Sequence, residues 1–373
     1  MDSFSCSIFP SCPGCKIQTN VTSPPILDRI NRFFEKKIPL IYGDIVEWRS
    51  KVKLAVRGTI DCPEIGLFAE NSHSVVPMTK CPLHYPAMDK ALSVIYKAIS
   101  AYQIEPYLEK TNQGRLRYLQ MVFDRKTEKV QLSLIFNAES LRENEIAFVK
   151  QLYNSLPFWH SIWVNFVSGP TNTILGSRWE LFQGEEDFWQ EILGIPFYFH
   201  PSSFSQAHLG VFEEMLKEIA LYLPEKANLL ELYAGVGCIS LSLASKASFL
   251  TLVESSPLSL FCFRKTLSRM NSEISSKSLF FLEPVEEASF PEEVDVILVD
   301  PPRKGLSKKC KEKIFASKAT QCVYVSCGPD SCLRDCKDFE AAGWFVDDVK
   351  AFLFFPGQDH VELLVNLKRA AIS

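Results

Sequence analysis

Four cysteines near the start of the chain have the spacing of a metal-binding set. They are Cys6, Cys12, Cys15 and Cys81. The spacing is close to, but not identical with, the C-x4-C-x2-C…C pattern that holds iron–sulfur clusters in plant-type ferredoxins. A zinc ion held by four thiolates fits this spacing nearly as well. Four unligated thiols are a third interpretation, and the spacing alone does not separate the three.

A cysteine and a glutamate near the end of the chain could carry out covalent and acid–base chemistry. Cys327 ends an apolar stretch and precedes Gly328 and Pro329. A helix beginning at this proline would direct its positive end at the thiol, which predicts a stabilised thiolate. Glu362 opens the last apolar stretch, where a carboxylate is costly unless it has a partner or a function. The simpler alternatives are a buried core cysteine and a glutamate on a solvent-exposed edge strand.

A glycine-containing turn between a strand and a helix indicates a nucleotide site. Gly235 and Gly237 lie in NLLELYAGVGCIS, and Glu254 ends the next apolar stretch, 19 residues after Gly235. A carboxylate at that place can accept hydrogen bonds from ribose hydroxyls. Position 240 is serine and not the third glycine of GxGxxG. This favours a nucleoside without a pyrophosphate, such as S-adenosylmethionine. Asp300, in VDVILVDPPRKGL, ends another apolar strand, at the edge where doubly wound sheets bind ligands.

The elements that must position these residues follow from the hydrophobic pattern. After about residue 200, apolar strands alternate with helices, which predicts an α/β doubly wound fold with a parallel sheet covered on both faces. The last two strands have no helix between them and should pair antiparallel at the end of the sheet. Before residue 200 the pattern is α+β, with helices at 86–101 and 137–155 and a hairpin at 114–136. We therefore expect two domains, 1–200 and 201–373.

Composition limits the class of protein. The chain is 47% hydrophobic and 23% charged, as expected for a globular protein. It has no apolar run of 18 residues and no basic segment followed by an apolar one, so we expect a cytoplasmic protein without membrane spans. A disulfide framework is then a poor interpretation of the 12 cysteines. The net charge of −4 excludes a globally basic nucleic-acid binder but allows a local basic groove.

The ordered set of motifs resembles the RNA uracil-C5 methyltransferases. The matching stretches run from about residue 6 to residue 369 and are CSIFPSCPGC, EWRSKVKLAV, TKCPLHYP, PSSFSQAHLG, LLELYAGVGCISLSLA, FLTLVESS, VDVILVDPPRKGL, VYVSCGPDSCLRDCKDF and FPGQDHVELLVNLKR. The resemblance implies a class I S-adenosylmethionine-dependent methyltransferase domain and methyl transfer to C5 of a uridine in RNA.

The resemblance also implies residue roles. Cys327 would be the nucleophile that adds to uracil C6, and Glu362 the base that removes the C5 proton. Gln206, Tyr233, Gly235, Glu254 and Asp300 fall where the family holds the methyl donor. Cys6, Cys12, Cys15 and Cys81 would hold a [4Fe-4S] cluster. The sequence departs from the family at Ser205 (usually Phe), His208 (usually Asn), Glu231 (usually Asp), Gly328 (usually Asn) and Leu353 (usually Asp).

Family architecture separates the substrates. By resemblance, a typical tRNA-type member of the family would lack the cysteine cluster, which favours a 23S rRNA enzyme. One rRNA type has a β-barrel before the cysteines, for which Cys6 leaves no room. We therefore expect the short rRNA type, acting as a monomer on 23S rRNA, with residues 26–36 packed on the catalytic domain. Candidate RNA contacts are Arg49, Lys51, Lys53, Arg57, Arg115, Arg117, Arg303, Lys304, Lys308 and Lys309.

Three alternatives remain open at the level of sequence. The first is a tRNA uracil-C5 methyltransferase. The second is an amino-methyltransferase that uses the DPPR loop and needs no thiol. The third is an inactive iron–sulfur RNA-binding protein.

Overall fold

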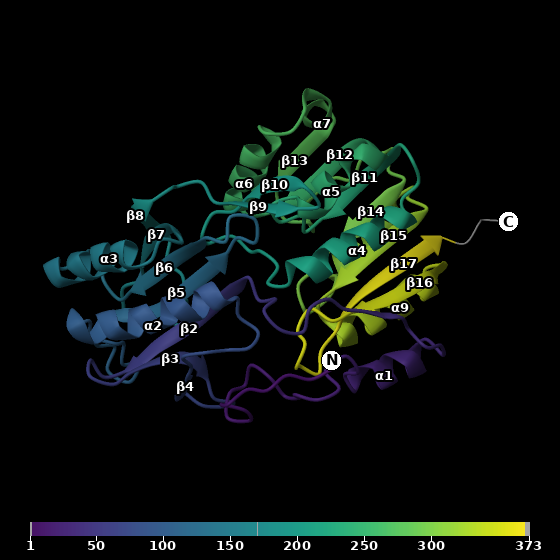
Figure 1. Cartoon of the computed structure of the whole chain (residues 1–373). Helices are drawn as coiled ribbons and strands as arrows, with labels where there is room; N and C mark the ends of the chain where they lie inside the picture. Colours follow the sequence, from purple (N-terminus) through teal and green to yellow (C-terminus); the bar gives the residue numbers. More distant parts are fainter. Residues whose placement is uncertain (1, 170, 370–373) are drawn as a thin grey trace. The chain divides into compact units, whose positions relative to one another are not determined.

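The computed structural model describes residues 2–169 and 171–369. They form two compact units, each with its own sheet and hydrophobic core (Figure 1). The first unit contains the chain up to Val21, Asp44–Gln190 and Phe199–His208. The second contains Thr22–Gly43, Glu191–Tyr198 and the chain from Leu209 onward. The chain thus passes repeatedly between the units, where the sequence analysis placed one boundary at residue 200.

The first unit is built on a seven-stranded sheet in the order β4-β3-β2-β5-β6-β7-β8. Its strands are β2 (Lys51–Gly58), β3 (Pro63–Phe68), β4 (Val75–Pro77), β5 (Leu116–Phe123), β6 (Val130–Phe136), β7 (Trp159–Phe166) and β8 (Arg178–Gly184). Helices α2 (Pro86–Ala101) and α3 (Glu143–Ser155) pack on this sheet through one apolar cluster. The predicted hairpin and the predicted helix at 86–101 are confirmed.

The second predicted helix begins later than expected, and the reason is its N-terminal cap. The hydrophobic pattern predicts a helix from Asn137, whereas α3 starts at Glu143. The Glu145 carboxylate accepts a hydrogen bond of 2.7 Å from the backbone N–H of Arg142, which fixes the first turn there. The predicted hydrophobic pattern begins before Glu143, so the pattern alone does not locate the N-terminal cap.

The second unit is built on an eight-stranded sheet in the order β1-β16-β17-β15-β14-β11-β12-β13. The strands are β1 (Leu40–Ile41), β11 (Ala227–Leu232), β12 (Ala247–Glu254), β13 (Ser278–Leu282), β14 (Val296–Val299), β15 (Gln321–Ser326), β16 (Trp344–Phe352) and β17 (Glu362–Arg369). Strands β11 to β15 are parallel, and β17 lies antiparallel between β15 and β16. The doubly wound sheet and its antiparallel pair are confirmed, although β1 adds one further strand outside β16.

Helices cover this sheet unevenly. They are α1 (Ile26–Phe33), α4 (Leu209–Tyr222), α5 (Cys238–Ser242), α6 (Pro257–Leu267), α7 (Ser272–Ser276), α8 (Lys308–Ala316) and α9 (Pro329–Ala341). Residues 283–295, all described by the structure, form neither helix nor strand between β13 and β14. Phe249, Leu279 and Phe281 at that edge therefore remain exposed.

The early segment Thr22–Gly43 completes the core of the second unit. Ile30 of α1 is fully buried there, and Ile38 is 3% exposed. The backbone N–H of Ile26 donates to Asp359 Oδ1 at 2.7 Å, and β1 pairs with β16 through Leu40 and Ala351. The core beside the eight-stranded sheet thus depends on residues that are far apart in the sequence.

A short hairpin lies between residues 189 and 198. It comprises β9 (Trp189–Ile192) and β10 (Ile195–Tyr198), joined by Leu193 and Gly194 in left-handed conformations. None of the helices in the described parts of the chain is long and apolar enough to cross a membrane. All 12 cysteines are unbridged in this structure.

Candidate active site

The carboxyl ends of β11 and β12 form a tight, glycine-dependent loop in the second unit. After β11 the chain takes left-handed conformations at Tyr233, Gly235 and Gly237. A Cβ on Gly237 would lie 2.8 Å from a ring carbon of Phe263, so only glycine fits there. A Cβ on Gly235 would meet no atom within 4 Å, which leaves open space beside its backbone. The loop can therefore bring its backbone close to a ligand.

Glu254 is held at the tip of β12 by backbone N–H groups. Its Oε1 accepts hydrogen bonds from Ser255 and Ser256 at 2.8 and 2.9 Å. Its Oε2 accepts one from Gly235 at 3.1 Å. The carboxylate orientation is therefore fixed relative to the glycine loop. Each carboxylate oxygen has two lone pairs, so Oε2 retains capacity for a ligand hydroxyl.

Glu231, one strand residue before the loop, is an internal support. It is buried, and its Oε2 accepts a hydrogen bond of 3.0 Å from the backbone N–H of Ser240 in α5. Burial raises the pKa of Glu231 to about 8. The Glu231 side chain fastens α5 to β11. In the sequence, Glu231 stands out only as a departure from the family pattern.

The side chain of Tyr233 points into the core of the second unit and is not placed to contact a ligand. Its phenol packs against the core of the second unit and forms a hydrogen bond with the Cys310 thiol of α8. Burial raises the pKa of Tyr233, so the phenol is neutral. In this structure Tyr233 contributes to the loop through its left-handed backbone, while its side chain contributes to packing.

Cys327 and Glu362 are neighbours on adjacent antiparallel strands. Ser326, at the end of β15, pairs with Leu363 of β17. Continuing that register by one residue places Cys327 opposite Glu362. Asp300 follows β14, the strand on the other side of β15. The two predicted catalytic residues and this aspartate therefore meet at one edge of the sheet, although they are distant in sequence.

The electrostatics of this group differ from the sequence-based expectation. Burial raises the pKa of Glu362 to about 8, with a further increase from Asp300 and an opposing effect from Arg303. Burial also raises the pKa of Asp300 to about 7. The pKa of the Cys327 thiol is raised by burial, by Glu362 and by Asp300. The prediction of a stabilised thiolate is therefore wrong for the free protein.

The reason lies in which charges reach the thiol. Helix α9 begins at Pro329 as predicted. Burial and the carboxyl groups of Glu362 and Asp300 raise the pKa of the Cys327 thiol by more than the cation of Arg303 lowers it. Neither carboxylate forms a hydrogen bond with any residue that the structure describes. A bound substrate or donor that brings positive charge or N–H donors would shift this balance towards the thiolate.

The DPPRKG loop that carries Asp300 and Arg303 is anchored by a residue that the sequence analysis missed. Asp335, fully buried in α9, accepts hydrogen bonds from the backbone N–H of Leu306 at 2.8 Å and from Tyr324 at 2.9 Å. Lys311 also donates to Asp335 at 2.9 Å. An acid flanked by Cys332, Cys336 and Phe339 on the buried face of a helix was the available signal.

Gln206 belongs to the first unit, whereas the other residues assigned to the donor belong to the second. It lies in the segment Phe199–His208, which is hydrogen-bonded to Ser50 and to Lys51, the first residue of β2. The Ser50 hydroxyl donates to the carbonyl of Ala207 at 2.9 Å, and the Lys51 Nζ donates to that of Ser203 at 2.7 Å. Phe204, beside Gln206, is exposed.

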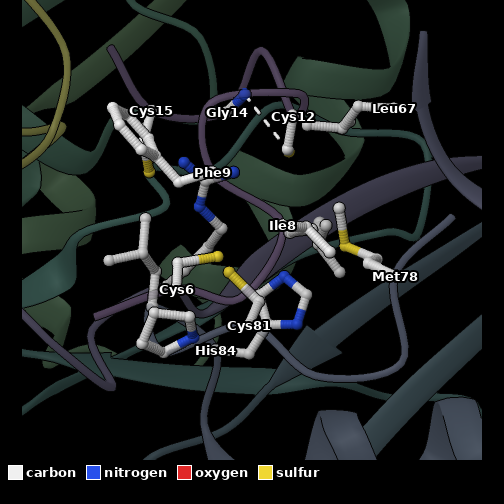
Figure 2. A pocket seen from close by; sticks show the side chains of 14 residues that line it. Cys6, Ile8, Phe9, Cys12, Gly14, Cys15, Leu67, Met78, Cys81 and His84 are labelled. Atoms are coloured by element: carbon white, nitrogen blue, oxygen red, sulfur yellow. Dashed lines mark hydrogen bonds between the residues drawn. The ribbon is translucent and has the colours of Figure 1, made fainter. Parts of the chain in front are cut away.

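The four predicted metal-ligating cysteines line one pocket of the first unit. Cys6, Cys12 and Cys15 lie on the N-terminal loop, and Cys81 lies after β4 (Figure 2). The Gly14 backbone N–H donates to Cys12 Sγ at 3.4 Å. Burial raises the pKa of Cys15 to about 12, and Cys81, Cys12 and Cys6 raise it as well. Among the residues that the structure describes, no three His, Cys, Asp or Glu side chains are grouped to hold a single metal ion.

Several cations predicted to contact RNA are used inside the first unit. Arg57 pairs with Glu109, and Arg115 Nε lies 2.6 Å from Glu145. Arg117 donates to the Thr171 carbonyl at 2.8 Å. The lysines and arginine after Asp300 are exposed, namely Arg303, Lys304, Lys308 and Lys309. The second group, unlike the first, keeps its charges available at the surface.

Comparison with known proteins agrees with this geometry. Residues 270–370 match the family model described as tRNA (uracil-5-)-methyltransferase. An uncharacterized RNA methyltransferase of Protochlamydia amoebophila is 38% identical, over 98% of this chain and 97% of its own length. One from Geobacter sulfurreducens is 28% identical over 97% of this chain and 76% of its own.

A solved structure shares the fold. The tRNA (uracil-54, C5)-methyltransferase of Pyrococcus abyssi, solved in complex with S-adenosyl-L-homocysteine, superposes with a TM-score of 0.80. The match covers 96% of this chain and 86% of that one at 23% identity. With the doubly wound sheet and the relative from Protochlamydia, these matches show that the chain belongs to the RNA uracil-5-methyltransferase family and is an S-adenosylmethionine-dependent RNA methyltransferase.

Proposed function

We propose that this enzyme methylates C5 of a uridine in RNA through a covalent bond between Cys327 Sγ and uracil C6. The observation that carries the proposal is the placement of Cys327 opposite Glu362, with Asp300 beside them. Uracil C5 is a poor nucleophile, and addition of a thiolate to C6 makes it an enolate carbon. A base is then needed for the C5 proton, and a carboxyl whose pKa is about 8 suits that role near neutral pH.

The steps follow from these two side chains. The Cys327 thiolate adds to C6, and the electron pair of the C5–C6 double bond moves towards C5 and O4. C5 then forms its bond to the methyl group as the bond between that methyl group and the sulfonium sulfur of the donor breaks, which leaves S-adenosylhomocysteine. Glu362 removes the remaining proton from C5, the double bond re-forms, and the bond between C6 and Cys327 Sγ breaks. The thiolate is regenerated and Glu362 is left protonated.

The residues of the glycine loop fit the methyl donor. S-adenosylmethionine supplies an electrophilic methyl group when bound. Glu254 offers a fixed acceptor for ribose hydroxyls, and Gly235 leaves open space beside it. Asp300, which lacks a partner among the described residues, can accept from an amino group or oppose a positive charge. Tyr233 and Gln206 are assigned to the donor by motif, Tyr233 through its backbone.

Two variants test the covalent mechanism. Cys327→Ala should abolish both the protein–RNA adduct and methylation, because C5 is never activated. Glu362→Gln should form the methylated adduct and retain it, since the C5 proton has no base. Denaturing gels with labelled RNA and labelled donor distinguish these results. Cys322→Ala, which removes a buried thiol from the same strand, is the matched control and should leave adduct formation intact.

Three outcomes would contradict the mechanism. Release of methylated RNA by Glu362→Gln at the wild-type rate would assign the base elsewhere. His360 would then be tested first, because its Nε2 is buried and has no hydrogen-bond partner among the described residues. Methylation by Cys327→Ala would instead favour an amino-methyltransferase that works through the DPPR loop. Donor binding without turnover on any RNA would favour an inactive RNA-binding protein.

We further propose that the four cysteines hold a [4Fe-4S] cluster that takes no part in methyl transfer. The donor set is four thiols lining one pocket, with an N–H donor on Cys12 Sγ. A zinc ion would take four thiolates on one metal, whereas a [4Fe-4S] cluster takes one thiolate on each of four irons. The resemblance carried by these four positions favours the cluster over zinc.

Metal analysis tests the cluster directly. The full chain, purified without oxygen, should contain iron and sulfide in equal amounts and absorb in the visible range. Replacing Cys81 with Ser should remove both. Zinc in place of iron in that preparation would contradict the proposal.

Within the family, 23S rRNA is the substrate that we propose. The cysteine set supports it by resemblance, whereas the matching family model and the solved Pyrococcus enzyme are both named for tRNA. Mapping 5-methyluridine in rRNA and tRNA from cells with and without the gene separates these substrates. Loss confined to 23S rRNA is expected, and loss confined to tRNA would assign the enzyme to the tRNA group.

A further inference from the structure

Arg49 stands at the cysteine pocket without a carboxylate partner. It lines the pocket together with Cys12, Cys15 and Cys81. It forms no ion pair with any described carboxylate. Its Nε is buried and has no hydrogen-bond partner in the described part of the chain. A partly buried guanidinium whose Nε is buried without a partner is costly unless negative charge compensates it. Four cluster-bound thiolates are the negative charge available there.

The backbone beside Arg49 is bonded to the loop that carries Cys81. The N–H groups of Trp48 and Arg49 both donate to the carbonyl of Leu83, at 3.1 and 2.8 Å. The N–H of the same Leu83 donates to the Cys81 sulfur. A single residue thus links the sulfur of one cysteine to the backbone of Trp48 and Arg49.

The other side of this stretch contacts the segment that carries Gln206. The Arg49 guanidinium lies over the Trp48 ring, 4.9 Å from its centroid. The Trp48 ring stacks on His208, with centroids 4.8 Å apart and planes 10° from parallel. The Ser50 N–H donates to the Ala207 carbonyl at 2.8 Å. All of these residues belong to the first unit.

We infer that Arg49 is a positioning residue that links the cysteine site to the segment Phe199–His208. When the cysteine site is occupied, this segment is fixed, and Gln206 is fixed with it. The inference rests on the proposed cluster. The positive charge of Arg49 balances the thiolates, and this attraction keeps the guanidinium over the Trp48 ring. The Trp48 ring then holds His208 in place. Without the cluster, the guanidinium loses its counter-charge, and the stack that restrains the segment loosens.

The test uses the full chain, purified without oxygen, with two readouts besides activity. One is the rate at which a chelator removes iron, followed by visible absorption. The other is hydrogen–deuterium exchange of the peptide covering residues 199–208 and of the Ser50 amide, before and after iron removal. In the wild type, iron removal should speed exchange in this peptide.

Four substitutions separate charge, stacking and general stability. Arg49→Met should release iron about tenfold faster, the scale of one charge-assisted contact, and should speed exchange even when loaded. Arg49→Lys keeps the charge but not the planar stack, so its iron release should stay near wild type while exchange increases. Lys51→Met removes the bond to the Ser203 carbonyl and should speed exchange without changing iron release. Lys53→Met, two residues further along β2, should change neither.

Three results would overturn the inference. Iron release from Arg49→Met at the wild-type rate would show that Arg49 does not balance the thiolates. Unchanged exchange at residues 199–208 after iron removal from the wild type would show that the site and the segment are uncoupled. A wild-type chain that binds no metal would overturn both this inference and the cluster, while the adduct experiments on Cys327 and Glu362 would still decide the methyl transfer.

Discussion

Glu362 determines how the enzyme should respond to pH. Its pKa of about 8 means that the carboxyl is mostly protonated at pH 6, whereas a base must be ionised. The Cys327 thiol, whose pKa is also raised, must likewise lose its proton. We therefore expect kcat/KM to rise between pH 6 and pH 8.5 without an intervening maximum. A flat profile of initial rates over this range would show that neither group titrates in the free enzyme.

The same carboxyl makes a prediction about stability. Its folded pKa of about 8 lies above the unfolded value of about 4.3. Between these values the folded protein binds a proton that the unfolded chain has lost. Its contribution is therefore fully present below about pH 4.3 and is lost as pH rises through about 8. Glu362→Gln should have a higher Tm than wild type at pH 8.5 and an equal Tm at pH 4. Thermal melts in matched buffers check this, and equal melting temperatures at pH 8.5 would contradict it.

Gly328 departs from the family pattern for a reason that the structure supplies. A Cβ at this position would lie 2.5 Å from the carbonyl oxygen of Arg303. We expect Gly328→Asn to displace the DPPRKG loop, to lower stability by about 1–3 kcal/mol and to reduce kcat. Gly328→Ala introduces the same Cβ and should reproduce most of the effect. Wild-type melting and turnover in Gly328→Ala would show that the loop adapts freely.

Single residues were predicted unevenly from the sequence. The identities of Cys327, Glu362, Glu254 and Asp300 could be proposed because each ends or opens a strand at the ligand-binding edge. The side-chain direction of Tyr233 and the pKa of Cys327 could not. Both depend on neighbours from other elements, namely Cys310 for the phenol and Glu362 for the thiol.

At the scale of elements, helix α9 supports the DPPRKG loop through one buried acid. Asp335→Ala would leave the Leu306 N–H and the Tyr324 hydroxyl without their acceptor and Lys311 with only Asp338. We expect a loss of about 3 kcal/mol in the free energy of unfolding and a raised KM for the donor. Urea unfolding and donor titration measure the two effects.

The matched control lies one turn further along the same helix. Asp338 pairs with the same lysine but is half exposed, so Asp338→Ala should change stability by about 0–1 kcal/mol. Equal losses in the two variants would mean that the loop does not depend on Asp335.

Periodicity predicted the elements of the second sheet because its strands are short, apolar and separated by helices. It did not predict the hairpin at residues 189–198. Its turn residues are Leu193 and Gly194, not the Asn-Gly pair that marks such turns most clearly. The placement of β1 was also out of reach. Two residues carry no periodic signal, and their partner, β16, lies more than 300 positions away.

At the scale of the whole molecule, the early helix α1 should act as part of the second core. Ile30 is fully buried there. Ile30→Ala should lower the free energy of unfolding by about 2–4 kcal/mol through the lost side chain and the cavity left behind. Ile26→Ala, on the same helix at a partly buried position, should cost less. Urea unfolding of the two variants, with and without the donor product, measures their losses in free energy of unfolding. Equal losses in Ile30→Ala and Ile26→Ala would contradict the assignment of α1 to this core.

The bond between Ile26 and Asp359 joins residues 333 positions apart in the sequence. Ribosomes add about 5–20 residues per second, so the N-terminal half of this contact waits roughly 15–70 seconds for its partner. During that interval the apolar face of α1, including Ile30, has no completed core to enter. The apolar face of α1 in a nascent chain must therefore avoid contact with other chains until β17 has left the ribosome. Slow translation of the codons between residues 34 and 359 should lower the yield of folded enzyme more than equally slow translation of the codons before residue 26.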